Sequence, residues 1–141
     1  MNLNEIYEYA DEKNYSIYYF PMKELVSIVT PDGFIGIDVD KLENTADELA
    51  CITHEIGHLE TGSFYNIYSP IDIRSKHEAV ADHWAIKKLI PKNELIEVLS
   101  SGICEIWDLA EYFNLPENFI KKALKYYSNE IEGINYLYCS A

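Results

Sequence analysis

The sequence predicts an α+β fold, with a short β-sheet or hairpin near the N-terminus, then a motif-bearing helix and further helices toward the C-terminus. Runs of β-branched and aromatic residues are confined to residues 16–39, and helical spacing of apolar residues begins after Asp40. The 141 residues are 48% hydrophobic, and we find no linker, repeat or low-complexity tract among them. We therefore expect a single domain, with a helical part at about 92–128 packed on the core.

The N-terminal part contains the predicted strands. Residues 2–13 have a helical composition. Three β-branched or aromatic runs follow, at 16–22, 25–30 and 34–39. The turn sequence Pro-Asp-Gly at 31–33 separates the last two runs, so we expect these two to form a hairpin.

Two sequences of the capping-box type predict where the long helices begin. The box at 45–48 predicts a helix through about residue 59, and the box at 75–78 predicts a second helix that Pro91 stops after Ile90. The segment between these helices is a loop of turn formers and aromatic residues. Three shorter helices are expected at about 92–100, 104–113 and 117–128.

The composition excludes several classes of partner. The net charge of −13 comes from 24 Asp and Glu against 11 Lys and Arg, which argues against nucleic acid and anionic membranes. No stretch approaches the length of an apolar membrane span, and the acidic start is unlike a secretory leader. Cys51, Cys104 and Cys139 are odd in number and far apart, which favours reduced thiols. We therefore expect a cytoplasmic protein.

The first long helix carries the pattern H-E-x-x-H. On a helical wheel its core face is formed by Leu49, Ile52, Ile56 and Leu59. His54 and His58 lie on the other side, about 40° from each other and one turn apart, so both can point at a common atom. Two imidazoles at this spacing bind zinc, and the Glu beside the first, Glu55, works as a general base. The alternative is an exposed helix face that carries two histidines.

A catalytic zinc site needs a third protein ligand, and the predicted second helix supplies a candidate. Glu78 and Asp82 share one face of that helix with small and apolar residues, and buried carboxylates need a partner. We expect Glu78 to bind the metal and Asp82 to accept the second ring N–H of a ligating histidine. Two alternatives remain open: Glu78 caps its own helix together with Ser75, or His77 is the third ligand.

Two small residues of the motif helix bear on the same site. Cys51 lies one turn before His54, so it could be a fourth ligand that closes the site, although such a cysteine is more often a small buried hydrophobe. Gly57 costs about 1 kcal/mol relative to Ala within a helix. Its presence predicts that another backbone passes close by.

In residues 54–91 the H-E-x-x-H string is followed by EAVADHWA at 78–85 and then by an apolar segment that ends in proline. This order resembles the ImmA/IrrE family of metallopeptidases, whose second element is E-x-x-A-[DN]-x-[FW]-A. The resemblance implies a small zincin-like fold of the gluzincin type with one zinc ion per chain. The residues that it assigns are the zinc ligands His54, His58 and Glu78 and the catalytic Glu55.

The expected function is therefore that of a zinc-dependent endopeptidase. Zinc would bring the pKa of water toward about 7, and Glu55 would take the proton and return it to the departing amine. A further donor to the oxyanion is usual, and the nearby candidates are Tyr65, Tyr68 and His83. The strand expected at 34–39 would offer its free edge to an extended substrate.

The resemblance also implies a partner, because family members typically cut a helix-turn-helix transcriptional repressor, often one encoded beside them in a phage or mobile element. An acidic protein suits such a basic target. Residues 106–127 themselves have a helix-turn-helix outline, but 105–125 hold four acidic and three basic residues and no arginine, which disfavours DNA binding. A non-catalytic zinc-bearing domain of regulatory or antitoxin-like kind is the main alternative, although an intact Glu55 favours an enzyme.

Overall fold

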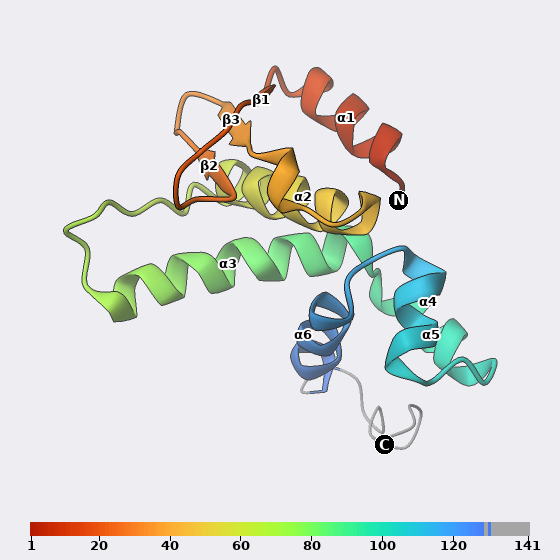
Figure 1. Cartoon of the computed structure of the whole chain (residues 1–141). Coiled ribbons are helices and arrows are strands. Elements are labelled where there is room, and N and C mark those ends of the chain that lie inside the picture. Colours follow the sequence, from red (N-terminus) through yellow and green to blue (C-terminus); the bar gives the residue numbers. More distant parts are fainter. Residues whose placement is uncertain (129, 131–141) are drawn as a thin grey trace. The chain divides into compact units, whose positions relative to one another are not determined.

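The computed structural model describes residues 1–128 and 130, and within this range the chain is an α+β fold with six α-helices and a three-stranded mixed sheet (Figure 1). The helices are α1 (Leu3–Glu12), α2 (Thr45–Thr61), α3 (Ile71–Leu89), α4 (Lys92–Ser100), α5 (Ile106–Phe113) and α6 (Glu117–Tyr127). The strands are β1 (Ser16–Tyr19), β2 (Ser27–Val29) and β3 (Phe34–Ile37), and a short 3₁₀-helix (Val39–Lys41) follows β3.

The predicted hairpin is confirmed as β2 and β3, which pair antiparallel with Ser27 opposite Ile37. Its turn closes where the Gly33 N–H donates to the Thr30 carbonyl at 3.0 Å. Gly33 has a φ of 97°, a left-handed conformation that favours glycine. The turn sequence therefore defines this part of the sheet locally.

β3 is the central strand of the sheet, because β1 pairs with its other edge in parallel. The prediction that the strand at 34–39 offers a free edge is therefore wrong. A hairpin signal shows only one neighbour of a strand, and the second neighbour comes through a crossover connection that has no local signature. The edge strands are β1 and β2.

The starts of both long helices differ from the predictions. Asn44, rather than Thr45, caps α2, since its side chain accepts the Asp47 N–H at 2.9 Å. α3 begins at Ile71, directly after Pro70, so Ser75 lies inside the helix and the expected capping box there is wrong. Glu78 is therefore not used to cap its own helix.

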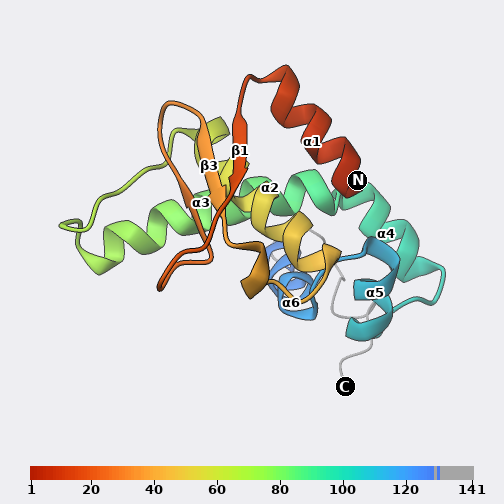
Figure 2. The same ribbon diagram turned by 45° about the horizontal axis from the view of Figure 1, so that its top comes forward.

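The chain divides into two units, Met1–Ala85 and Ile86–Ala141, and α3 contributes residues to both. In the first unit α2 packs against α1 and the sheet, and α1 also contacts β1 (Figure 2). Its fully buried residues include Ile6, Ile35, Ile37, Leu49, Ile52 and Ile56. In the second unit α5 packs against α6. A single domain, with the helical part packed on the core, stays a prediction.

Two further expectations concern the cellular compartment of the protein. No helix in the described residues is long and apolar enough to cross a membrane. Cys51 is a free thiol, but Cys104 is disulfide-bonded, which contradicts the expectation of reduced thiols at that position. Cys139 lies outside the described residues. The cysteine argument for a cytoplasmic protein is therefore reduced to Cys51.

Candidate metal centre

His54 and His58 project from the same side of α2, one helical turn apart. Their ring centroids are 4.9 Å apart and the rings are nearly perpendicular, at 89°. His58 is buried, with 4% of its surface exposed, and His54 is half-buried. The four-residue spacing on a regular helix thus brings two imidazoles together in a partly desolvated place.

Glu78 on α3 completes a group of three side chains that could hold a metal ion. Its Oε2 lies 2.7 Å from His54 Nε2, and its Oε1 lies 3.2 Å from His58 Nε2. One ligand atom from each of the three residues lies within 4.8 Å of the others. Two imidazole nitrogens and one carboxylate oxygen are the donor set of many catalytic zinc sites.

Gly57 allows α2 and α3 to approach each other at this point. A Cβ at Gly57 would lie 2.7 Å from the carbonyl oxygen of Ala81 and 3.2 Å from its Cα. These are backbone atoms, so a larger residue would force the helices apart. The expected close approach is confirmed, and it brings Glu78, one turn before Ala81, to the histidines.

Each histidine is oriented by a hydrogen bond at its Nδ1. His54 Nδ1 lies 2.8 Å from Asp82 Oδ1, and His58 Nδ1 lies 2.6 Å from the Ser63 carbonyl oxygen. Carboxylate and carbonyl oxygens accept hydrogen bonds, so the Nδ1 atoms donate and each Nε2 is turned toward Glu78. Asp82 lies where the sequence predicted it.

Sequence reasoning missed the contact with Ser63. The chain reverses at Gly62, which caps α2 with a φ of 65°, and the Ser63 N–H bonds back to the His58 carbonyl at 3.2 Å. A glycine just past a helix end signals such a reversal. The direction of a backbone carbonyl has no side-chain signature, so the sequence could not show which group orients His58.

Hydrogen bonds between the side chains of the centre shift the pKa values of His54 and Glu78 so that both are charged. Burial lowers the pKa of His54, but hydrogen bonds to Asp82 and Glu78 outweigh it and raise the pKa to about 10. Hydrogen bonds with His54 and His58 hold the pKa of Glu78 well below its usual range. Without a metal, both ring nitrogens of His54 are thus protonated at neutral pH, and a metal ion would have to displace the proton on Nε2.

Glu55 lies beside the three potential ligands without belonging to them. It is buried, with 6% of its surface exposed, and its Oε1 lies 3.8 Å from His54 Nε2. Burial raises the pKa of its carboxyl, against the opposing charges of the two histidines. A carboxyl with a raised pKa that borders such a group is suited to accept a proton and release it again.

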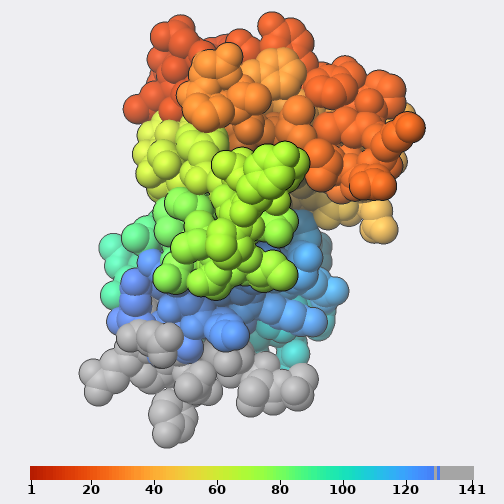
Figure 3. Space-filling model, turned by 90° about the vertical axis from the view of Figure 1, so that its left-hand side faces the viewer, coloured from red at the N-terminus to blue at the C-terminus, as the bar shows by residue number. Residues whose placement is uncertain are grey.

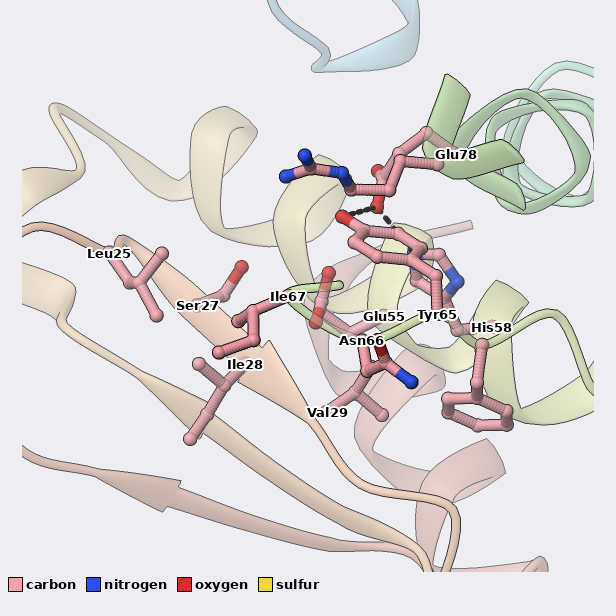
Figure 4. Close-up of a pocket in the computed structure, with 12 residues that line it drawn as sticks. Leu25, Ser27, Ile28, Val29, Glu55, His58, Tyr65, Asn66, Ile67 and Glu78 are labelled. Carbon is pink, nitrogen blue, oxygen red and sulfur yellow. Dashed lines mark hydrogen bonds and ion pairs between the residues drawn. The ribbon is translucent and has the colours of Figure 1, made fainter. Parts of the chain in front are cut away.

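A cavity of about 380 Å³ opens next to the centre. Glu55, His58 and Glu78 form part of its lining, whereas β2, the segment just before it and the loop after α2 provide an apolar wall (Figure 4). The residues of this wall are Leu25, Ile28, Val29, Phe64 and Ile67. Apolar walls with a few convergent polar groups are typical of ligand sites.

The three candidate oxyanion donors are placed differently. The Tyr65 hydroxyl donates to Glu78 Oε1 at 2.7 Å, and Tyr65 also lines the cavity. Tyr68 is 88% exposed and His83 is exposed on α3, and neither lines the cavity. The geometry therefore favours Tyr65 over the other two.

The alternative ligands His77 and Cys51 lie outside the group of three. The His77 ring stacks on that of Tyr65, with ring centroids 6.3 Å apart. Cys51 is a half-buried free thiol whose pKa is raised by burial, which disfavours the thiolate that a metal requires. Among the described residues, the group with metal-binding geometry is His54, His58 and Glu78.

No protein-family model matches the chain, and no curated protein or solved structure matches it either. The case for a function therefore depends on the centre itself and on the motifs of residues 54–91.

Proposed function

We propose that the chain is a zinc-dependent endopeptidase with a small zincin-like fold of the ImmA/IrrE type. The observation that carries the proposal is the convergence of His54, His58 and Glu78 beside the buried Glu55 and an open cavity. The donor set and the oriented rings fit zinc. Zinc held by these three side chains would lower the pKa of water toward about 7 and polarise a peptide carbonyl.

Glu55 carries the proton in this reaction. Its carboxylate takes a proton from the attacking water, and the resulting acid delivers that proton to the departing amine nitrogen. Burial raises the pKa of Glu55, which favours the protonated acid that donates to the amine. Tyr65 is the candidate donor for the oxygen that gains negative charge, and for this its single O–H would turn from Glu78 Oε1, to which it donates at 2.7 Å, toward that oxygen.

β2 is the strand along which an extended substrate would lie. It is an edge strand, and its residues Ser27, Ile28 and Val29 line the same cavity as Glu55. Edge strands present unpaired backbone groups that pair with an extended peptide. This path replaces the one that the sequence suggested along residues 34–39.

The charge of the first unit supports a basic protein as substrate. Residues 1–85 hold sixteen Asp and Glu against five Lys and Arg, a net charge of −11, whereas the rest of the chain carries −2. An acidic surface accelerates the approach of a basic protein and favours it over acidic ones. The substrate we propose is a helix-turn-helix repressor, cut in the cytoplasm where such repressors act.

Metal analysis together with a cleavage assay tests this function. The zinc-loaded protein is incubated with purified helix-turn-helix repressors, and the products are identified by mass spectrometry. We expect one zinc per chain and a discrete cleavage, with Glu55→Gln retaining zinc but not cleaving. A zinc-bearing wild type that leaves the repressors and unstructured peptides intact would instead indicate a non-catalytic regulatory domain. A wild type that binds no zinc would refute the metal centre.

A further inference from the structure

Arg74 is the only arginine of the chain, and it lies beside the candidate centre. It lines the cavity next to β2 and also a second, more open hollow of about 380 Å³ along α3. Glu78 lines both as well. In Figure 3 the lime-green start of α3 and the loop before it face the viewer, beside the orange segment that contains β2. A guanidinium therefore borders both hollows that adjoin the metal-binding carboxylate.

The guanidinium is anchored but not neutralised. Its Nε donates to the Ser69 carbonyl at 3.0 Å, which fixes the side chain to the loop before α3. Within residues 1–128 and 130, no carboxylate lies at ion-pair distance from it, although residues 1–85 carry a net charge of −11. The two Nη nitrogens thus remain as donors for a ligand.

Helix stability gives no reason for a cation at this place. Arg74 is the fourth residue of α3, close to the positive end of the helix dipole, where a carboxylate is favoured and a cation is disfavoured. Lys87 and Lys88, by contrast, lie in the last turn of α3, where the dipole favours positive charge. The position of Arg74 is explained better by what borders it than by its helix.

We propose that Arg74 binds the substrate, with its Nη nitrogens donating to a backbone carbonyl oxygen next to the scissile bond. This proposal rests on the proposed peptidase function and extends it to a residue that recognises the peptide backbone. Glu55 and Glu78 line the first hollow, and Glu78 and Asp82 line the second. An acidic substrate side chain would be repelled by these carboxylates, so a neutral carbonyl is the favoured acceptor. The planar guanidinium holds such an oxygen in a defined orientation.

The test compares Arg74→Gln and Arg74→Lys with Lys76→Gln, which removes the same charge from an exposed residue of α3. The probes are short synthetic peptides with blocked ends, and zinc content and melting temperature are measured for every variant. We expect Arg74→Gln to lower kcat/KM about 10- to 100-fold, because a charge-assisted hydrogen bond is lost, while zinc content is unchanged. Arg74→Lys should recover part of the loss, and Lys76→Gln should stay within about twofold of wild type.

A thioamide scan of a cleaved peptide identifies the acceptor, since sulfur is a weaker acceptor than oxygen. At one position beside the scissile bond the thioamide should slow the wild type but have little effect on Arg74→Gln. Activity of Arg74→Gln within about twofold of wild type would overturn the proposal, and so would a thioamide penalty equal in both proteins. A defect confined to peptides with Asp or Glu beside the cut would assign Arg74 to a carboxylate instead. A zinc-loaded wild type that cleaves no peptide and no repressor would refute the peptidase function itself, and the role of Arg74 with it.

Discussion

The two units of the chain bury different kinds of side chain. In residues 1–85 the buried set includes five polar or charged residues, Asp38, Thr53, Glu55, His58 and Ser63. In the described part of the second unit the buried side chains are apolar, apart from the hydroxyl of Tyr127, which donates to the Ile90 carbonyl at 2.7 Å. The first unit also holds nearly all of the net charge, −11 of −13.

This difference shows which buried residues are not explained by core packing alone. A buried polar group costs free energy unless it is hydrogen-bonded, so such groups are not needed to stabilise a core. Glu55 and His58 belong to the candidate centre, and Ser63 orients His58 through its carbonyl oxygen. The other two lie elsewhere, since Thr53 bonds locally to the Leu49 carbonyl at 2.7 Å and Asp38 accepts the Met22 N–H at 3.0 Å. Three of the five buried polar residues of the first unit are therefore at the site, whereas the described buried side chains of the second unit are apolar apart from the Tyr127 hydroxyl.

The largest expected effect is the loss of bound zinc when a metal ligand is removed, and all three ligands lie in the first unit. His58→Ala and Glu78→Ala each leave two of three ligands, so we expect bound zinc to fall from one per chain to well below that value. Elemental analysis of dialysed protein measures it. His83→Ala is the matched control, since His83 is exposed on the same helix as Glu78. Zinc retained at wild-type level in Glu78→Ala would remove this residue from the centre.

Glu55→Gln should separate proton transfer from metal binding. The amide cannot accept the proton, so kcat should fall by about 10²- to 10⁴-fold while zinc content stays at one per chain. Steady-state kinetics on a cleaved peptide measure the loss. Glu97→Gln, an exposed change on α4, should leave kcat unchanged. An equal loss of kcat in both variants would contradict the assignment of the chemistry to the first unit.

Leu109→Ala should weaken the second unit without affecting the chemistry. Leu109 is fully buried on α5, and its truncation should lower the free energy of unfolding by about 2–5 kcal/mol. Urea denaturation followed by circular dichroism measures this change. Zinc content of the folded variant should equal that of wild type. A variant that folds but no longer binds zinc would show that the second unit contributes to the centre.

Gly57→Ala tests the close approach of α2 and α3. Helix propensity alone would stabilise this variant by about 1 kcal/mol. The added Cβ, however, would lie 2.7 Å from the Ala81 carbonyl oxygen, and overpacking of this kind costs about 1–3 kcal/mol. We therefore expect a small net destabilisation in urea and a weaker zinc affinity in a chelator competition. Increased stability with unchanged affinity would contradict the close contact.

The smallest expected effect is the number of protons that are released when zinc binds. The pKa of His54 is raised from 6.5 to about 10 in the metal-free protein, so its hydrogen bonds to Asp82 and Glu78 stabilise the fold fully below pH 6.5 and progressively less as the pH rises through 10. At pH 8, zinc binding should therefore release about one proton from His54. Calorimetric titrations in two buffers of different ionisation enthalpy measure this number. Binding without proton release would contradict the charged state of His54.

Much of the fold was accessible from local patterns. The hairpin around Gly33, the motif helix and the three C-terminal helices lie close to their predicted ranges, because turn residues and helical spacing act between near neighbours in the chain. The start of α3 was predicted four residues too late, because Ser75 resembles a cap although Pro70 already precedes the helix. Similar residues compete as caps, and only the folded chain shows which one is used.

By itself the sequence determined the pair of histidines and Glu55, since their separation along one helix sets their geometry. It also indicated, through Gly57, that another backbone passes nearby. The tertiary structure alone decided that Ala81 is the residue in contact, that Glu78 reaches both histidines, and that β2 is the edge strand beside them. These contacts are between segments that are distant along the chain. They depend on how helices and strands pack against each other, which the spacing of residues within one element does not determine.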